Sequence, residues 1–235
     1  MQSALAEQQT PLELPEPQST VLSPISWQTY ESLLKDLEEE DQVQLTYDQE
    51  RLEIIMSPLL LPHERYSTLI HDFIRILGDE LALDICSLGS TTLRRQDLQC
   101  GLEPDKSYYI QHENQVRDQQ ILDLTQLPPP DLVVEVDMTN PSLKKLPIYL
   151  VLGVPELWRY DGEMFDIYQK IDNDYVKCEV SLVFNLPLCT IIPELLKKSF
   201  RISERIVLSE FRQWVRKQIG SVNGTDKVTY KNIDL

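Results

Sequence analysis

Glycine is scarce in this chain, with seven glycines among 235 residues. Loops that cradle phosphate groups of nucleotides are rich in glycine, and the patterns GxGxxG, GxxxxGK[ST], HExxH and GxSxG are all absent from the sequence. The scarcity of glycine and the absence of these motifs disfavour a nucleotide cofactor and the common zinc-protease and serine-hydrolase chemistries.

The sequence also lacks long apolar runs and paired cysteines. No apolar stretch approaches the roughly 20 residues that cross a bilayer. The first 20 residues are rich in Pro, Gln and Glu and carry no basic segment followed by an apolar one, so they are predicted to be disordered and not a signal peptide. The four cysteines form no CxxC pair, which is simplest to interpret as reduced thiols in a cytoplasmic protein.

Positive charge is in short supply, and what there is lies unevenly. The chain has 22 Lys and Arg against 38 Asp and Glu, a formal net charge of −16. This balance argues against a protein that coats DNA through a broad basic surface, but a nuclease remains compatible because divalent cations offset the repulsion from phosphate. Residues 197–217 hold seven bases against two acids, which favours a solvated helix face over a phosphate contact.

Apolar periodicity predicts an alternation of helices and strands, the order of an α/β layered core. The expected elements are a helix from Ser26, a hairpin over 43–56, a helix from His63 to about Leu83, strands over 85–95 and 107–111, a loop over 112–130, a strand over 131–138, a short helix from Ser142, an antiparallel run of strands over 157–184 and an amphipathic helix over 203–219. The division predicted from this order is a disordered lead-in (1–24), a single domain (25–219) and a flexible tail (220–235).

Residues 129–161 are the most informative stretch, because they read as strand, helix and strand with acids inside an apolar strand. Side chains of a strand alternate between its faces, so Asp131, Glu135 and Asp137 share one face. A buried strand gains nothing from acids on one face unless they are solvated, paired or bound to a cation. This pattern predicts a metal-dependent site at a sheet edge, with a nuclease as the leading function.

Four blocks of the sequence carry a family resemblance, in the order 51–70, 101–110, 129–142 and 145–162. The chain resembles, over residues 26–215, the Uma-type restriction endonuclease family, which is common in cyanobacteria and is similar to a branch of the PD-(D/E)XK nuclease superfamily. The resemblance implies an α/β fold with a mixed central sheet flanked by helices, an N-terminal helix and hairpin, and a C-terminal amphipathic helix. It also implies an active site at one edge of the sheet.

The resemblance assigns roles to individual residues. The aspartate of the "PD" element matches Asp105, and the acid of the "(D/E)xK" element matches Glu135. The position of the usual lysine is occupied by Asp137, and the family's lysine matches Lys145 on the following helix, ten residues after the acid. The glutamate of the first long helix in many relatives matches Glu64.

These residues are expected to carry metal-assisted hydrolysis of DNA. Mg²⁺, with Mn²⁺ as a possible substitute, prefers oxygen ligands, and the expected ligands are Asp105, Glu135 and the carbonyl oxygen of Val136. Glu64 is expected to hold a metal-bound water or a second ion. Lys145 is expected to orient or deprotonate the attacking water and to stabilise developing negative charge. The expected partners are DNA and a second copy of the chain, with no membrane.

Each assignment has a structural alternative. Asp105 is also explained as a turn residue, and Glu135 as an outward-facing acid of an edge strand. Lys145 is also explained as a solvated helix residue, in which case Lys144 is the functional lysine, and Glu64 as an acid that favours a helix N-terminus.

Other polar and aromatic residues are expected to be structural. Asp131 is expected to help start its strand, with support of the site as the alternative, and Tyr149 and Trp158 are expected to pack in or near the core. His63 and His71 are expected to be ordinary surface or core histidines. At the level of the whole protein, the alternatives to a nuclease are a catalytically inert binding or regulatory module and a structural dimerisation protein.

Overall fold

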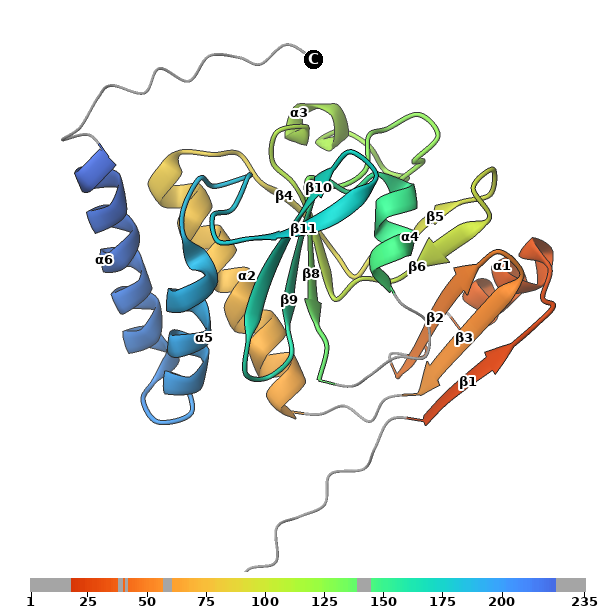
Figure 1. The fold of residues 1–235 in the computed structure, drawn as a ribbon, viewed down its shortest axis with the longest axis horizontal. Helices are drawn as coiled ribbons and strands as arrows, with labels where there is room; N and C mark the ends of the chain where they lie inside the picture. Colours follow the sequence, from red (N-terminus) through yellow and green to blue (C-terminus); the bar gives the residue numbers. More distant parts are fainter. Residues whose placement is uncertain (1–17, 38–39, 41, 57–60, 139–144, 223–235) are drawn as a thin grey trace, which may run out of the picture.

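Two β-sheets, packed side by side, organise the protein (Figure 1). The structure is a computed structural model, and it describes residues 18–37, 40, 42–56, 61–138 and 145–222. A five-stranded antiparallel sheet has the order β1-β3-β2-β6-β5, and a six-stranded mixed sheet has the order β11-β10-β9-β8-β7-β4. The predicted α/β fold with a mixed sheet flanked by helices is confirmed.

The five-stranded sheet is built around a hairpin. Its strands are β1 (Gln18–Leu22), β2 (Val43–Asp48), β3 (Arg51–Met56), β5 (Leu93–Arg95) and β6 (Cys100–Leu102). The turn between β2 and β3 places Gln49 and Glu50 at positive φ, 45° and 69°, as two-residue hairpins require. Helix α1 (Trp27–Asp36) covers one face and begins where predicted, because Ser26 caps it by accepting a hydrogen bond from the Thr29 amide.

The predicted disordered lead-in over residues 1–24 is wrong for its last part. Residues 18–22 form β1, which pairs antiparallel with β3 from Gln18 opposite Met56 to Leu22 opposite Leu52. All five residues of β1 are exposed, so the strand is held by main-chain pairing and not by an apolar face, which is why periodicity did not show it. Residues 1–17 lie outside the described part.

The six-stranded sheet positions the candidate site. Its strands are β4 (Cys86–Gly89), β7 (Lys106–Tyr109), β8 (Leu132–Val136), β9 (Glu156–Tyr160), β10 (Phe165–Ile171) and β11 (Asp174–Cys178). β8 and β9 are parallel and are joined through α4 (Lys145–Leu152), whereas the other neighbouring strands of this sheet are antiparallel. The β8–α4–β9 unit is therefore the predicted strand–helix–strand stretch.

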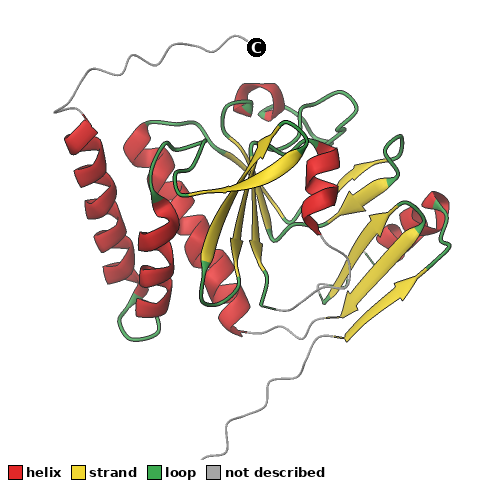
Figure 2. Cartoon of the chain, viewed as in Figure 1, coloured by secondary structure: helices red, strands yellow, loops and turns green. Residues whose placement is uncertain are grey.

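Helices cover both faces of this sheet (Figure 2). Helix α2 (Leu61–Leu81), α5 (Leu188–Lys198) and α6 (Glu204–Val222) pack on one face, and α4 packs on the other. The short α3 (Glu113–Val116) follows β7. The predicted alternation in β8 is confirmed, since Leu132, Val134 and Val136 join the core beneath α2 whereas Val133 joins the core beneath α4.

Several predicted boundaries were wrong. The single strand predicted over 85–95 is two strands, β4 and β5, that belong to different sheets. The loop predicted over 112–130 contains α3, and the C-terminal helix continues to Val222, into the predicted tail. Helix α5 was not predicted, and it contains Pro193, a residue that normally ends helices. In the described part of the chain, no helix combines the length and apolar character needed to span a bilayer.

Candidate active site

The three main candidate residues come from three different elements and meet at one end of the mixed sheet. Asp105 lies just before β7, Glu135 lies within β8, and Lys145 begins α4. The antiparallel register places Lys106 opposite Val134, which brings the start of β7 beside the end of β8. Both acids are buried, with Asp105 8% exposed and Glu135 4% exposed. The structure brings the three residues together, but at one end of two interior strands and not at an edge strand of the sheet, where the site was expected.

Asp105 is tied to β8 and to α2. Its Oδ2 accepts a hydrogen bond from the amide of Val136 at 2.5 Å and lies 3.4 Å from Nε2 of His63. Burial raises the pKa of Asp105, but the contact with His63 and the charge of Lys145 lower it more, so its pKa lies below the usual value. Asp105 is therefore held ionised. The structural alternative, that Asp105 is a simple turn residue, does not account for these contacts.

Glu135 is bound on both of its carboxylate oxygens. Oε2 accepts a hydrogen bond from Nζ of Lys145 at 2.7 Å, and Oε1 accepts one from the hydroxyl of Tyr149. Burial and the negative charge of Asp105 raise the pKa of Glu135 to about 7, against the opposing effect of Lys145. The buried side chain contacts Lys145 and Tyr149 of α4, and β8 lies between two other strands, so Glu135 is not an outward-facing acid of an edge strand.

Lys145 reaches Glu135 because of where α4 begins. Lys145 and Tyr149 are four residues apart and hence share one face of α4, and both contact the same carboxylate. Burial lowers the pKa of Lys145, but the charges of Glu135 and Asp105 raise it more, so the amine is held protonated. The alternative lysine, Lys144, lies outside the described residues.

At position 137, where the superfamily pattern has a lysine, this chain has Asp137, which forms an ion pair with an arginine. Oδ2 of Asp137 accepts hydrogen bonds from Arg159 at 3.0 and 3.2 Å. Arg159 lies on β9, one strand away from β8. An acid at position 137 is thus accommodated by a neighbouring base, while the lysine reaches Glu135 from α4.

The structure brings His63 into the site, which the sequence analysis did not predict. His63 lies in the first turn of α2, with Nε2 near Asp105 and Nδ1 3.1 Å from Oε1 of Glu64. Burial lowers the pKa of His63, but its contacts with Asp105 and Glu64 raise it more, to about 9. Glu64 itself is 55% exposed and reaches Asp105 only through this histidine. The signal for His63 was its place directly before Glu64 at a helix start.

The remaining candidates have structural roles. Asp131 lies outside this group and is fully buried, where it accepts hydrogen bonds from the amides of Ile110 and His112 at 2.6 and 3.0 Å. It thereby joins the end of β7 to the start of β8, as expected of a residue that helps to start the strand. His71 contacts the hydroxyl of Tyr108 at 3.1 Å, away from the candidate acids.

The donor set suits a hard divalent cation. Asp105 and Glu135 supply carboxylate oxygens, and the main chain at Val136 lies beside Asp105. In the described ranges, no three His, Cys, Asp or Glu side chains form a ready cage for a metal ion. Mg²⁺ is commonly bound through only one or two carboxylates together with water and substrate phosphate, so two buried acids fit it.

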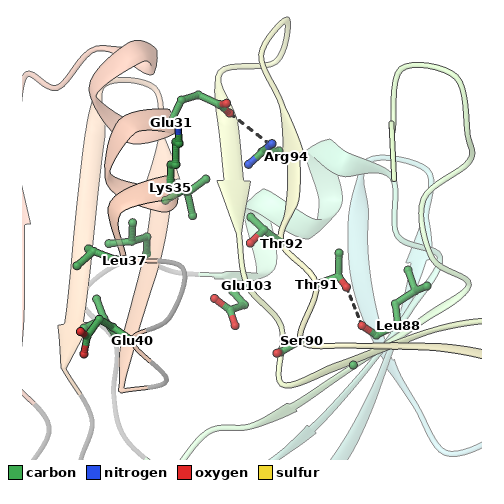
Figure 3. Close-up of a pocket in the computed structure, with 14 residues that line it drawn as sticks. Glu31, Lys35, Leu37, Glu40, Leu88, Ser90, Thr91, Thr92, Arg94 and Glu103 are labelled. Carbon is green, nitrogen blue, oxygen red and sulfur yellow. Dashed lines mark hydrogen bonds and ion pairs between the residues drawn. The ribbon is translucent and has the colours of Figure 1, made fainter. Parts of the chain in front are cut away.

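A separate groove lies between α1 and the connection from β4 to β5 (Figure 3). It has a volume of about 780 Å³ and is lined by residues of mixed charge, among them Glu31, Lys35, Arg94 and Glu103. An ion pair of 3.3 Å between Arg94 and Glu31 crosses one side of it. Neither acid of the candidate site nor Lys145 lines this groove, so it is distinct from the site.

Comparison with known proteins agrees with this geometry. A family model named Uma2, with the description "Putative restriction endonuclease", matches residues 27–203, well over half of the chain. No curated protein matches the chain. The matched range contains both acids, Lys145, His63 and Glu64. The mixed sheet flanked by helices is consistent with the restriction-endonuclease-like fold of the PD-(D/E)XK superfamily. The chain therefore belongs to the Uma2 family, which indicates a nuclease.

Proposed function

We propose that the protein is a Mg²⁺-dependent endonuclease that hydrolyses phosphodiester bonds of DNA. The observation that carries the proposal is the contact of 2.7 Å between Lys145 and Glu135, which restores a carboxylate–lysine pair although position 137 is an aspartate. Asp105, bound to the next residue of the same strand, completes the set of two acids and one lysine.

Asp105, Glu135 and the carbonyl oxygen of Val136 are the proposed ligands of Mg²⁺, with Mn²⁺ as a substitute. When bound, Mg²⁺ supplies a Lewis acid for the phosphate and a more acidic water. The chain contributes the orientation of the two acids, since the Val136 amide and His63 fix Asp105 and the hydroxyl of Tyr149 fixes Glu135. Oxygen ligands held in this way need little rearrangement when substrate arrives.

Lys145 is proposed to stabilise negative charge on the phosphate. Its raised pKa keeps a proton on Nζ, so the residue acts as a charged hydrogen-bond donor and orients the attacking water without removing its proton. Only 15% of its side chain is exposed, and an ammonium group with little surrounding water interacts strongly with a phosphate oxygen.

His63 is proposed as a positioning residue and Glu64 as an acid at the entrance. His63 carries its charge at neutral pH and holds Asp105 from the side of α2. More than half of the Glu64 side chain is exposed, so its carboxylate remains hydrated. It is proposed to hold a metal-bound water or a second ion beside His63. This role for Glu64 stands on its place next to the site and not on a contact with either acid.

The test measures metal binding and DNA nicking in the same proteins. Asp105→Asn and Glu135→Gln remove one charge each with little change in shape. We expect both variants to lose Mn²⁺ binding by calorimetry and to lose nicking of a supercoiled plasmid in Mg²⁺ or Mn²⁺. Asp166→Asn is the matched control, because Asp166 is also a partly buried acid paired with a lysine, Lys177, at 2.6 Å.

Nicking that survives in both site variants would place the chemistry elsewhere. Loss of nicking in Asp166→Asn as well would mean that the assay reports folding and not the site.

A catalytically inert nuclease-fold module is the second candidate, and one observation favours it. Both oxygens of Glu135 already have donors, Lys145 and Tyr149, so the acid is satisfied without a cation. A wild-type protein that binds neither Mg²⁺ nor Mn²⁺ would favour this alternative over the nuclease.

A further inference from the structure

An exposed aromatic side chain lies beside the candidate site and plays no part in the proposed chemistry. Phe200, in the connection between α5 and α6, is 46% exposed although most large aromatic residues of the described chain are buried. Its ring lies 5.3 Å from the ring of Tyr66 on α2, and the guanidinium of Arg65 lies 4.2 Å from its centre. We call these three residues, Arg65, Tyr66 and Phe200, the aromatic platform.

The platform is rigidly supported from below. Tyr66 packs edge-on against Tyr160, with the ring centres 4.9 Å apart. Arg65 donates a hydrogen bond to the carbonyl of Ser199 at 3.1 Å and lies 3.4 Å from Glu204. Helix α2 and the α5–α6 connection both hold the platform in place. A ligand that stacks on the ring of Phe200 therefore costs little side-chain conformational entropy.

The platform adjoins the catalytic end of the sheet. Tyr160 lies opposite Val136 in the parallel β8–β9 pair, and Tyr66 follows His63 by one turn of α2. Figure 1 shows the start of α2 and the α5–α6 connection at the lower edge of the view, the direction in which β8 also points. Val136, Tyr160, Tyr66 and Phe200 thus form a series of neighbours that leads from the strand of Glu135 to the exposed ring.

The charge around the platform is locally positive in an acidic protein. Segment 197–205, which contains Phe200, has four basic residues and one acid, Glu204, and the guanidinium of Arg65 lies over the ring of Phe200. Lys197, Arg201 and Arg205 are exposed. The basic run of the sequence is thus divided, since Arg212 and Arg216 are bound to Glu80 of α2 whereas Lys197, Arg201 and Arg205 flank Phe200 in the sequence.

We propose that the aromatic platform binds an unpaired base of single-stranded DNA and so selects a single-stranded or frayed substrate for the proposed nuclease. A base inside a duplex has both faces covered by its neighbours, so an exposed ring can stack only on a base that is unpaired or displaced. The exposed basic side chains of Lys197, Arg201 and Arg205 are proposed to contact the phosphates on either side of the stacked base. The inference rests on the proposed function, but it concerns binding and not cleavage.

The test measures DNA binding by the full-length protein in EDTA, where the cleavage proposed above has no metal to support it. Fluorescence anisotropy compares a labelled oligothymidylate, its duplex with oligoadenylate, and an oligouridylate. We expect the single-stranded DNA to bind at least about tenfold more tightly than the duplex, the range expected for stacking of a base on an aromatic side chain. Plasmid nicking is measured separately, so an inactive nuclease can still show the preference.

Substitutions of Phe200 separate stacking from simple apolar contact. Phe200→Tyr keeps an aromatic face and should keep the preference, whereas Phe200→Leu and Phe200→Ala should lose it. Ile121→Ala is the matched control, because Ile121 is an exposed apolar residue, 80% exposed, in the segment that follows α3. Thermal unfolding of each variant shows that it is folded.

Four results with the wild type and the Phe200 variants would overturn the proposal, and a fifth comes from the control. They are equal or tighter binding of the duplex, no binding of single-stranded DNA, an unchanged preference in Phe200→Leu, and tighter binding of the RNA than of the DNA strand. A loss of preference in Ile121→Ala equal to that in Phe200→Ala would also count against the platform.

Discussion

At the scale of single residues, Lys145 is the group on which the proposed chemistry depends most. It is the one base in hydrogen-bond contact with Glu135 among the described residues, and it approaches from a helix and not from the strand. A charged donor that stabilises a transition state contributes to the rate far more than to the fold. Removing its amine should therefore separate catalysis from metal binding.

We predict that Lys145→Met lowers the nicking rate by about 100-fold or more, as expected when a charge-stabilising donor is lost. Mn²⁺ binding should persist, because both carboxylate ligands remain and Glu135 no longer has the lysine as a competing partner. Calorimetry and plasmid nicking measure the two quantities. Lys177→Met, which breaks the ion pair with Asp166, serves as the control and should nick like the wild type. Nicking at the wild-type rate in Lys145→Met would remove the residue from the mechanism.

A second residue-scale feature is the hydroxyl of Tyr30, which is buried and has no hydrogen-bond partner among the described residues. The ring of Tyr30 stacks on Tyr47 with centres 4.9 Å apart, and a Cβ at Gly101 would lie 2.5 Å from the hydroxyl. Position 101 therefore requires glycine because of a close approach by α1, and not because of its backbone angles.

We predict that Tyr30→Phe raises the free energy of unfolding by about 1 kcal/mol, because an unsatisfied buried hydroxyl is removed. Gly101→Ala should lower it by about 1–3 kcal/mol through overpacking, and the double variant should recover part of that loss. Urea unfolding of the three variants gives these values. A Tyr30→Phe variant less stable than the wild type would show that the hydroxyl is satisfied after all.

At the scale of elements, α2 and α6 are clamped together by a small group of ions. Glu80 of α2 accepts hydrogen bonds from Arg212 at 2.6 Å and from Arg216 at 2.7 and 2.9 Å, and Asp79 lies 3.3 Å from Arg212. The hydrogen bond from Arg216 has the largest effect on the pKa of Glu80 and, together with that from Arg212, lowers it against the opposing effect of burial. Arg212 and Arg216, which were predicted to lie on a solvated helix face, thus join α6 to α2.

The lowered pKa of Glu80 makes the clamp sensitive to acid. Because the folded-state pKa is below the unfolded one, the stabilisation is fully present above the unfolded pKa and is lost as the pH falls through the folded pKa. We predict that Glu80→Gln is less stable than the wild type at pH 7 and that the difference disappears at strongly acidic pH. Urea unfolding across this range measures it. A difference that is the same at every pH would mean that the charge of Glu80 is not involved.

Some elements of the fold could be predicted from the sequence and others could not. The period-two pattern of β8 was enough to place Glu135 on the face opposite Leu132 and Val134, because alternation is a local property. The three-residue strands β5 and β6 are too short to show any period, and Pro193 concealed α5. The contact of His63 with Asp105 joins residues 42 positions apart in the chain, and no local pattern reports such a contact.

At the scale of the whole molecule, the five-stranded sheet ends in a strand that is open to another chain. Among the described strands, β1 has a neighbour on one side only, and all its residues are exposed. Open strand edges are common sites of pairing between chains. A two-fold dimer would also suit an enzyme that cuts both strands of DNA.

We predict a homodimer, with a mass in solution of twice the 27.3 kDa of one chain by size-exclusion chromatography with light scattering. Val21→Lys adds a charge to β1, where Val21 is 38% exposed, and should shift the protein toward the monomer. Ile171→Lys is the control, because Ile171 is 50% exposed on β10, and it should leave the mass unchanged. A single-chain mass for the wild type at all concentrations would contradict the prediction.

The attachment of Lys145 to α4 also affects which substitutions the enzyme can tolerate. The main chain of a lysine two residues after Glu135 would be fixed by the sheet itself, whereas the main chain of Lys145 is fixed by the packing of α4 on the sheet. Ile148 and Leu152 anchor that helix in the core. A shift of about 1 Å in a catalytic group costs about 100-fold in rate, so the repertoire of acceptable residues at these anchors is restricted by catalysis as well as by folding.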